Sequence, residues 1–364
     1  MVDRLLIAAS WHRSAVFDQF LALGRSLHET GTEVHWLDDR RHDNAVAEPW
    51  LAALHQWPGS GRPQGLPALR YAHQLIREVR PDVVIANFGA VTPLGIAARR
   101  AGVSRRVCWY HSVSEAFPTG ASLPHRARQA LRVQGRTLAY RSYTDVVAVS
   151  TAAADDYTTL YGGRGPRAQV RHNAVTDGPH RTAPADGGAP LVVAGRLEPW
   201  KGIDVLVRAA AQLDPARRVL AMGEGSERAH LTRLAEELGV DLDLPGDTAH
   251  HEVREHMAEA AVVVVPSRAE AFGMVAIEGL SGGAPIVASD VGGLPEVVRP
   301  GETGFLVPPD DPDALAAALA SALEPARNRA MGAAARADFL DRFESARWGA
   351  DLADRFRTGR PLSS

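Results

Sequence analysis

The sequence has little lysine, little cysteine and no long apolar run. Of its 40 basic residues only Lys201 is lysine, and the other 39 are arginine. The single cysteine, Cys108, excludes an intramolecular disulfide bond and a cysteine-rich zinc site. Because no stretch approaches about 18 uninterrupted apolar residues, no transmembrane helix is expected. The net charge of −3 creates no overall field that would attract nucleic acid.

The length of 364 residues is too great for one ordinary core and suits two domains. A hydrophobic content of 45% and a charged content of 23% are normal for a soluble globular protein. Residues 1–10 predict a first strand rather than a signal peptide, so we expect a cytoplasmic protein. The excess of Arg, Ala and Gly is typical of high-GC codon usage and indicates an actinobacterial source. That bias alone does not explain why position 201 keeps lysine.

Strand-like and helix-like runs alternate through the first half of the chain. Near-continuous Val and Ile runs between helical segments are typical of a parallel sheet covered on both faces, so the sequence predicts a doubly wound α/β domain. The expected strands are 4–10, 33–37, 81–87, 105–111 and 145–150, and the expected helices are 15–30 and 65–80.

The alternation restarts after residues 176–190, which lack periodicity, are rich in Gly, Pro and Ala, and form the best linker candidate. The sequence thus predicts two similar α/β domains, residues 1–178 and 179–345, with a ligand cleft between them. We expect a C-terminal helix within 346–364 to cross back to the first domain. The later strands are expected at 190–195, 218–223, 261–267 and 285–290, and the later helices at 203–213, 227–238, 273–282, 313–323, 326–343 and up to about 356.

Two cations follow the strand expected at 190–195. Arg196 and Lys201 lie on a loop that opens a helix, at the rim where doubly wound domains bind ligands. Gly195 permits a tight turn, Gly202 lets the backbone approach a ligand, and helix amides add to a positive field that suits a pyrophosphate. Lysine carries a compact ammonium and arginine a planar fork, so a narrow site that needs a point charge cannot exchange them. A solvated loop with stray charges is the alternative interpretation.

The segment EAFGMVAIE, residues 270–278, directly follows another expected buried strand. Phe272 and Gly273 would turn the chain into a helix whose first amides point at an anion. Glu270 precedes the turn and Glu278 lies in the helix, where a carboxylate suits the vicinal hydroxyls of a sugar or ribose. The alternative is that Glu278 occupies an exposed helix position, and its apolar neighbours argue against that.

Three stretches of the second half resemble the retaining glycosyltransferases of the GT-B fold, specifically glycosyltransferase family 4. They are GRLEPWKGIDVLVRA, SRAEAFGMVAIEGLSGGAPIVASDVGGLPEVV and GETGFLVPPDDPDALAAAL. The resemblance covers most of residues 190–325 and extends more weakly over the first half, including DVVAVS and RHNAVTD. It implies two facing Rossmann-like domains, with the acceptor bound by the first and a nucleotide diphosphate sugar donor bound by the second. It also implies no obligatory metal or other cofactor.

The resemblance also implies roles for single residues. Arg196 and Lys201 would bind the donor diphosphate, and Glu278 would bind the nucleotide ribose. Glu270 and the backbone of the following turn would hold the transferred sugar and phosphate. The implied turn residues are Phe272, Gly273, Met274 and Val275, and a second turn beside the nucleotide base contains Gly223, Glu224 and Gly225. A glycine turn alone is weak evidence.

The strand expected at 105–111 ends in His111. A lone histidine after a strand is more often structural, but the resemblance matches His111 to the histidine that contacts the donor sugar near its reacting carbon. The implied catalytic residues are therefore His111, Arg196, Lys201 and Glu270. After the first strand the family usually has a glycine-rich loop, and this chain instead has SWHRS. The candidate acceptor residues are Trp11, His12, Ser14 and Asn87, and simple loop variation is the alternative.

Two further motifs have simpler interpretations. The Asp-x-Asp of residues 241–243 resembles a metal-binding motif of other glycosyltransferase folds, but a short strand is expected there, and we predict no metal site. The arginines of residues 125–136 could form a basic amphipathic helix that contacts anionic lipid. A solvated helix in an arginine-rich chain is the favoured interpretation.

The sequence therefore predicts a retaining glycosyltransferase. We expect it to move a hexose or N-acetylhexosamine from a UDP sugar to a hydroxyl acceptor, with a soluble small molecule of secondary metabolism as the favoured acceptor. A glycosyltransferase of cell-envelope lipid or polysaccharide synthesis is the first alternative, followed by a sugar-nucleotide epimerase and a non-catalytic nucleotide-sugar-binding protein. We expect no nucleic-acid partner, do not favour peripheral membrane contact, and expect a monomer or weak dimer.

Overall fold

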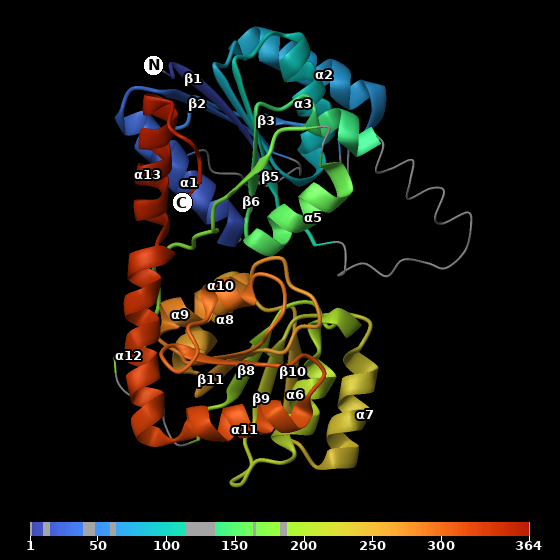
Figure 1. The fold of residues 1–364 in the computed structure, drawn as a ribbon, viewed down its shortest axis with the longest axis vertical. Helices are drawn as coiled ribbons and strands as arrows, with labels where there is room; N and C mark the ends of the chain where they lie inside the picture. The colour runs from blue at the N-terminus through green and yellow to red at the C-terminus, as the bar shows by residue number, and fades with distance from the viewer. Residues whose placement is uncertain are drawn as a thin grey trace, which may run out of the picture. The chain divides into compact units, whose positions relative to one another are not determined.

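The computed structural model describes residues 2–9, 15–38, 48–58, 63–113, 135–162, 165–182 and 188–363. Its contacts divide the chain into two compact units (Figure 1). The first unit is Met1–Asn173 together with Ser345–Ser364, and the second unit is Ala174–Glu344. The chain thus passes into the second unit before the predicted boundary after residue 178.

The described residues of the segment 176–190, which the sequence suggested as a linker, belong to the second unit. The amide of Arg181 donates to the carbonyl of Gly282 at 3.0 Å, and its guanidinium donates to Oδ1 of Asn328 at 3.2 Å and to the carbonyl of Ala260. These contacts attach the described part of the segment to the second unit. A low density of apolar residues is therefore a poor guide to where the chain changes units.

The described part of the first unit holds a parallel sheet of seven strands in the order β3-β2-β1-β4-β5-β6-β7. The order reverses between β1 and β4, which are hydrogen-bonded neighbours. The strands are β1 (Arg4–Ala8), β2 (Glu33–Asp38), β3 (Ala53–Gln56), β4 (Val83–Ala86), β5 (Arg105–Tyr110), β6 (Asp145–Ala148) and β7 (Ala168–Val170). The helices are α1 (Ala15–Glu29), α2 (Gly65–Val79), the 3-10 turn η1 (Phe88–Ala90), α3 (Val91–Arg100), α5 (Thr151–Tyr161) and α13 (Ser345–Thr358).

The described part of the second unit holds a parallel sheet of six strands in the order β10-β9-β8-β11-β12-β13. Here the order reverses between β8 and β11. The strands are β8 (Leu191–Ala194), β9 (Val219–Met222), β10 (Leu242–Gly246), β11 (Val262–Val265), β12 (Ile286–Ser289) and β13 (Gly304–Val307). The helices are η3 (Pro199–Lys201), α6 (Ile203–Ala210), α7 (Arg228–Leu238), α8 (His250–Glu259), α9 (Met274–Gly282), α10 (Leu294–Val297), α11 (Pro312–Leu323) and α12 (Pro325–Arg342).

The sheet of the second unit is buried because helices cover both of its faces (Figure 1). Helices α6, α7 and α11 pack together over one apolar cluster, and α9 packs with α8 and α12. All four residues of β11, VVVV, are buried. This is the pattern expected of a central parallel strand, and it confirms the predicted doubly wound class.

Helix α13 packs along α1 within the first unit. A Cβ on Gly349 would lie 2.6 Å from the backbone of Ala22, so only glycine permits this close approach. Trp348 then lies edge-on to Phe20 at 5.9 Å between ring centroids. The last helix is therefore part of the core of the first unit.

Candidate active site

The strand order of the second unit places two loops side by side. In open α/β sheets, ligands bind outside the carboxyl ends of the strands where the order reverses, which here is at β8 and β11. The loop after β8 carries Arg196 and Lys201, and the loop after β11 carries Glu270. The Nζ of Lys201 donates to Oε2 of Glu270 at 2.7 Å, so two predicted site residues meet at this point.

The turn that carries Lys201 depends on a glycine. Gly202 has a φ of 63°, and a Cβ there would lie 1.9 Å from the carbonyl oxygen of Pro266 in the neighbouring loop. The two loops can touch backbone to backbone only because position 202 has no side chain. Lys201 and Glu270 are each about one-fifth exposed (21% and 17% of the side chain), so the pair is partly shielded but open to a ligand.

Arg268 is hydrogen-bonded to the same turn, a contact that the sequence analysis did not predict. Its amide donates to the carbonyl of Trp200 at 2.8 Å, and its guanidinium donates to the carbonyl of Pro199. Both carboxylate oxygens of Asp204 accept from it at 2.9 Å. Although burial opposes the shift, these hydrogen bonds lower the pKa of Asp204. Arg268 therefore fixes the position of the turn that ends in Lys201.

Arg196 is exposed, and its guanidinium lies 4.9 Å from the ring centroid of Trp200. Its guanidinium forms no hydrogen bond or ion pair with the described residues, so its donors remain available to a ligand. A cation stacked on an aromatic ring keeps its hydrogen-bonding edge available to phosphate oxygens. Arg196 and Lys201 thus give this strand end one planar and one compact positive charge.

Helix α9 begins at the end of the loop that carries Glu270. Gly273 precedes it with a φ of 112°, and a Cβ there would lie 2.6 Å from Cδ2 of Leu294. The side chain of Phe272 is buried against Phe343, so a ligand would meet only its backbone. The N-terminus of α9, starting with Met274 and Val275, carries the positive end of the helix dipole to the strand end.

Glu278 is buried and paired with a histidine that the sequence did not suggest. It is 7% exposed, and its Oε1 lies 2.7 Å from Nε2 of His250, the first residue of α8. This contradicts the alternative of an exposed helix position. The imidazole holds the carboxylate in one orientation, so only part of the hydrogen-bonding capacity of Glu278 remains for a ligand.

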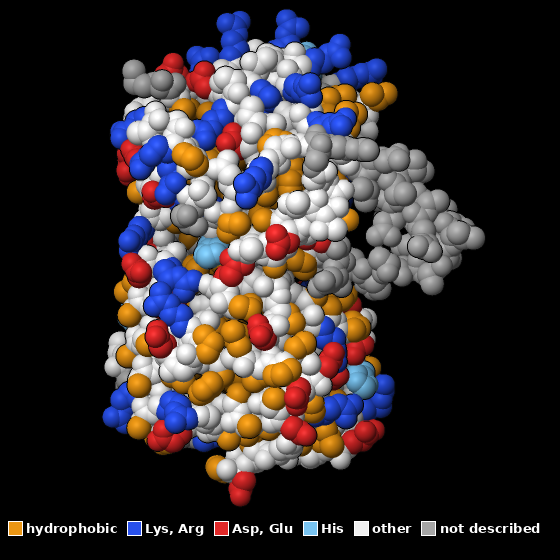
Figure 2. All heavy atoms as spheres, viewed as in Figure 1, with side chains coloured by type: hydrophobic (Ala, Val, Ile, Leu, Met, Phe, Trp, Pro, Cys, Tyr) orange, Lys and Arg blue, Asp and Glu red, His pale blue; other side chains and the backbone are white. Residues whose placement is uncertain are grey.

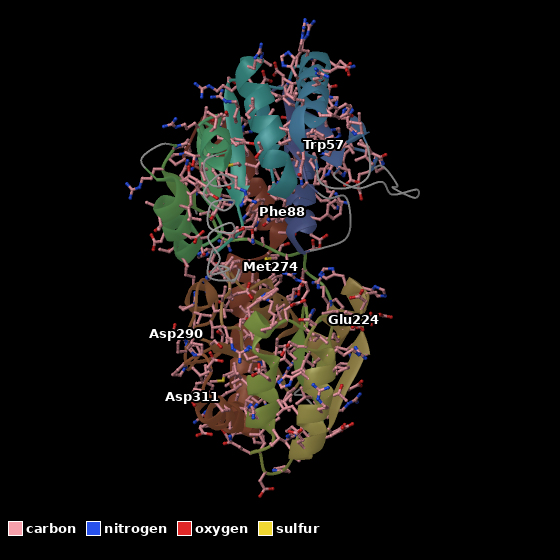
Figure 3. All side chains as sticks on the ribbon, turned by 90° about the vertical axis from the view of Figure 1, so that its right-hand side faces the viewer. Trp57, Phe88, Glu224, Met274, Asp290 and Asp311 are labelled. Atoms are coloured by element: carbon pink, nitrogen blue, oxygen red, sulfur yellow. The ribbon has the colours of Figure 1, made fainter. Side chains whose placement is uncertain are left out.

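The glycine turn after β9 packs against the loop that carries Arg196. A Cβ on Gly223 would lie 2.0 Å from the carbonyl oxygen of Gly195, and one on Gly225 would lie 2.2 Å from that of Leu197. Glu224 lies between them, is about half exposed, and pairs with Arg228 at 2.9 Å. Figure 3 shows Glu224 and Met274 at the same end of the second unit. The glycines of this turn therefore position the cationic loop.

In the first unit, His111 follows β5 and Asn87 follows β4, the neighbouring strand. Oδ1 of Asn87 lies 3.0 Å from Nε2 of His111, and Nδ2 of Asn87 donates to the carbonyl of Ala8 at 3.2 Å. Because the amide donor of Asn87 is used on Ala8, its oxygen must accept from Nε2–H of His111, which leaves Nδ1 unprotonated. Desolvation lowers the pKa of His111 to about 3, so the ring is neutral near pH 7.

Asn87 was predicted to contact the acceptor, and this contact stays a prediction. Its side chain is 2% exposed, and both ends of its amide are bonded within the unit. Its oxygen holds the imidazole of His111 through Nε2. The other candidate acceptor residues, Trp11, His12 and Ser14, lie outside the described residues.

Two sequence motifs remain, the Asp-x-Asp of residues 241–243 and the basic segment 125–136. Asp243 of the Asp-x-Asp lies on β10 and pairs with Arg218. Within the described ranges, no three His, Cys, Asp or Glu side chains cluster as a metal site, and no helix has the length and apolar character needed to span a bilayer. Most of the basic segment 125–136 lies outside those ranges.

Two Rossmann-like units with parallel sheets in one chain are the architecture of the GT-B fold. A sucrose-phosphate synthase from Thermosynechococcus elongatus superposes with a TM-score of 0.80 over 98% of both chains at 23% identity. The Anabaena protein Alr3699/HepE, solved in complex with UDP and glucose, superposes with a TM-score of 0.77 over 98% of this chain and 99% of that chain at 22% identity. At these identities the likeness shows the fold, and it confirms the predicted GT-B architecture.

The sequence comparisons identify the family. Residues 19–177 match the family model described as Glycosyltransferase Family 4, and residues 180–338 match Glycosyl transferases group 1. The GDP-mannose-dependent alpha-(1-6)-phosphatidylinositol monomannoside mannosyltransferase of Mycolicibacterium smegmatis is 33% identical over 303 residues, 75% of this chain and 76% of that protein. The chain belongs to glycosyltransferase family 4.

A second relative is similar over a shorter stretch. D-inositol 3-phosphate glycosyltransferase 1 of Catenulispora acidiphila is 34% identical over 229 residues, 56% of this chain. The match spans about half of that relative, 55% of its length.

Proposed function

We propose that this protein transfers a glycosyl group from a nucleoside diphosphate sugar to a hydroxyl acceptor, with retention at the anomeric carbon. The observation that carries the proposal is the meeting of Lys201 and Glu270 at the strand-order reversal of the second unit, with Arg196 and the start of α9 at the same strand end. Two cations and a helix N-terminus form an anion site suited to a diphosphate.

The same groups supply a chemical role. As the bond from the anomeric carbon to the phosphate oxygen breaks, negative charge develops on the leaving diphosphate, and Arg196 and Lys201 stabilise it. The acceptor oxygen forms its bond to the anomeric carbon on the same face, and its proton passes to the departing phosphate oxygen. No enzymic nucleophile is needed in this route.

Three further roles belong to this proposal. Glu278, held by His250, would accept from the ribose hydroxyls of the donor, and the turn with Gly223 and Glu224 would lie near the base. His111, neutral with an unprotonated Nδ1, would accept from a hydroxyl of the transferred sugar rather than act as a charged acid. The donor nucleotide is UDP or GDP, since UDP is bound by a protein of the same fold and the name of a family relative specifies GDP-mannose.

The test is a donor panel of UDP and GDP sugars, incubated with and without polyol acceptors, with free nucleoside diphosphate and products followed by mass spectrometry. We expect nucleotide release that rises with acceptor, and a product with the anomeric configuration of the donor by NMR. Formation of an isomeric sugar nucleotide without acceptor would instead indicate an epimerase. Binding of donor without any release would indicate a non-catalytic binding protein.

A lipid-linked acceptor is a second candidate, favoured by a basic face of the first unit. Figure 2 shows basic side chains gathered over α2 and α3, all of them arginine, and Arg70, Arg77, Arg80, Arg99 and Arg100 are exposed there. A groove of about 600 Å³ runs between the two helices. Clustered arginines attract anionic headgroups. Co-sedimentation with vesicles of phosphatidylglycerol, lost in an Arg70→Gln, Arg77→Gln double variant, would support this candidate, and no sedimentation would exclude it.

A further inference from the structure

Phe88 is exposed to solvent, and its backbone has a positive φ, which a bulky aromatic residue rarely adopts. It follows β4 and Asn87, has a φ of 49°, and is 52% exposed. Two other described non-glycine residues have a positive φ. Arg80 ends helix α2, where such a conformation is common, and Asp310 has the short polar side chain that tolerates it. Neither reason applies to a bulky aromatic residue, and strain of this kind gathers at functional sites.

The ring of Phe88 is fixed against the candidate active site. It stacks on the imidazole of His111 with 4.7 Å between centroids and 20° between planes. Asn87 holds that imidazole through Nε2 and is itself tied to Ala8 at the end of β1. The carboxyl ends of β1, β4 and β5 thus hold one aromatic ring in place, at the strand-order reversal where this sheet would bind a ligand.

The surface around this ring is mixed in character. Its described neighbours in the site are the imidazole of His111 and, behind it, the amide of Asn87, both polar. An acyl chain would need a longer apolar surface to cover its length. A cyclic ligand with an apolar C–H face and a polar edge of hydroxyls fits this surface. Its C–H face can lie on the ring of Phe88, and a hydroxyl can donate to Nδ1 of His111.

We infer that Phe88 selects the acceptor by stacking on the C–H face of a ring-shaped polyol, a cyclitol or a sugar. This inference rests on the proposed function, since it names the acceptor class of that transfer. The strained backbone keeps the ring exposed rather than folded into the core. The residue therefore sets which acceptors are used, while the second unit sets donor binding.

Two polyols with the same number of carbons and hydroxyls separate a cyclic from an open-chain acceptor. Both myo-inositol and D-mannitol have six carbons and six hydroxyls, and only the first is cyclic. Using the donor found active in the panel above, we expect wild type to have the higher kcat/KM for myo-inositol. Phe88→Leu keeps an apolar side chain but loses the aromatic face, and should lower kcat/KM for myo-inositol about 10-fold while leaving that for mannitol within about twofold. Phe88→Tyr should restore the preference.

Two more variants serve as controls for a loss of folded protein. Phe88→Asn places a residue that tolerates a positive φ at this position, and we expect its melting temperature to equal or exceed that of wild type although transfer to myo-inositol falls. Leu66→Ala, which truncates another exposed hydrophobic residue (65% exposed) on α2, should leave the preference unchanged.

The outcomes distinguish the two proposals. Absence of nucleotide release with every donor and acceptor would overturn the proposed function. Transfer with no preference for the cyclic polyol in wild type, or an equal loss for both polyols in Phe88→Leu, would overturn the acceptor inference alone.

Discussion

Replacing Gly202 with alanine should damage both stability and nucleotide binding, and the chain offers a matched control. Gly202 and Gly239 have almost the same φ, 63° and 67°, but a Cβ on Gly202 would lie 1.9 Å from the carbonyl oxygen of Pro266, and one on Gly239 would meet nothing within 4 Å. The left-handed conformation costs an alanine about 1–2 kcal/mol at either position. The difference between the two variants therefore isolates the close contact.

The contact adds to the cost at one position only. Relieving an overlap with backbone atoms requires a shift of the loop, and such overpacking costs about 1–3 kcal/mol. We expect Gly239→Ala to lower the free energy of unfolding by about 1–2 kcal/mol and Gly202→Ala to lower it by about 2–5 kcal/mol. Because Pro266 leads into the segment that carries Glu270, the shift should also separate Glu270 from Lys201.

The assay has two parts. Guanidinium denaturation gives the stability of wild type and both variants, and isothermal titration calorimetry with UDP and GDP gives their affinities. Gly202→Ala should bind its preferred nucleotide more weakly than wild type, and Gly239→Ala should bind it normally. Equal stability losses, or unchanged affinity in Gly202→Ala, would refute the account of this turn.

Three further substitutions test other contacts of the candidate site. Arg268→Met should weaken nucleotide affinity about 5-fold, because the turn that carries Lys201 loses its hydrogen bonds to the guanidinium. Arg268→Lys should recover only part of that affinity, because lysine lacks the planar fork. Unchanged affinity in calorimetry would mean that the turn keeps its position without Arg268. His250→Gln should reduce the preference for UDP over 2′,3′-dideoxy-UDP, because Glu278 is then held less well, and a constant ratio of dissociation constants would contradict that role. The pKa of His111 is about 3 in the folded state against 6.5 in the unfolded state, so the folded state binds fewer protons below pH 6.5. The wild type should therefore lose stability as the pH falls from about 6.5 towards 3. His111→Gln should lose less stability between pH 7.5 and pH 5, measured as the denaturation midpoint. Equal slopes would count against a neutral, partly buried imidazole at position 111.

Sequence patterns predicted many of the long elements of the fold, but they did not predict the helices α3, α5 and α8. Helix 65–80 is observed as Gly65–Val79, and strand 261–267 as Val262–Val265. Buried apolar runs and helical periodicity mark such elements directly. The sequence did not predict β3 or β7, which are short and only half-buried, because strands at the edge of a sheet need no continuous apolar run.

The candidate site was predicted in part. Lys201 and Glu270 stand in recognisable motifs after two buried strands, so their approach followed from the fold class. Two contacts of the site join residues far apart in the chain, and no local sequence pattern predicts them. They are the contacts of Arg268 with the Lys201 turn and of His250 with Glu278. Phe88 was missed because the sequence does not reveal a left-handed backbone at an aromatic residue.

The central claim is that Lys201 supplies the compact charge of a diphosphate site. Its most direct test is calorimetric titration of UDP and GDP into wild type and Lys201→Met, with Gly239→Ala as the folded control. A charge-assisted hydrogen bond contributes about 1.5–3 kcal/mol, so the account predicts a dissociation constant about 10- to 100-fold higher for Lys201→Met. Equal affinity in wild type and Lys201→Met would contradict it.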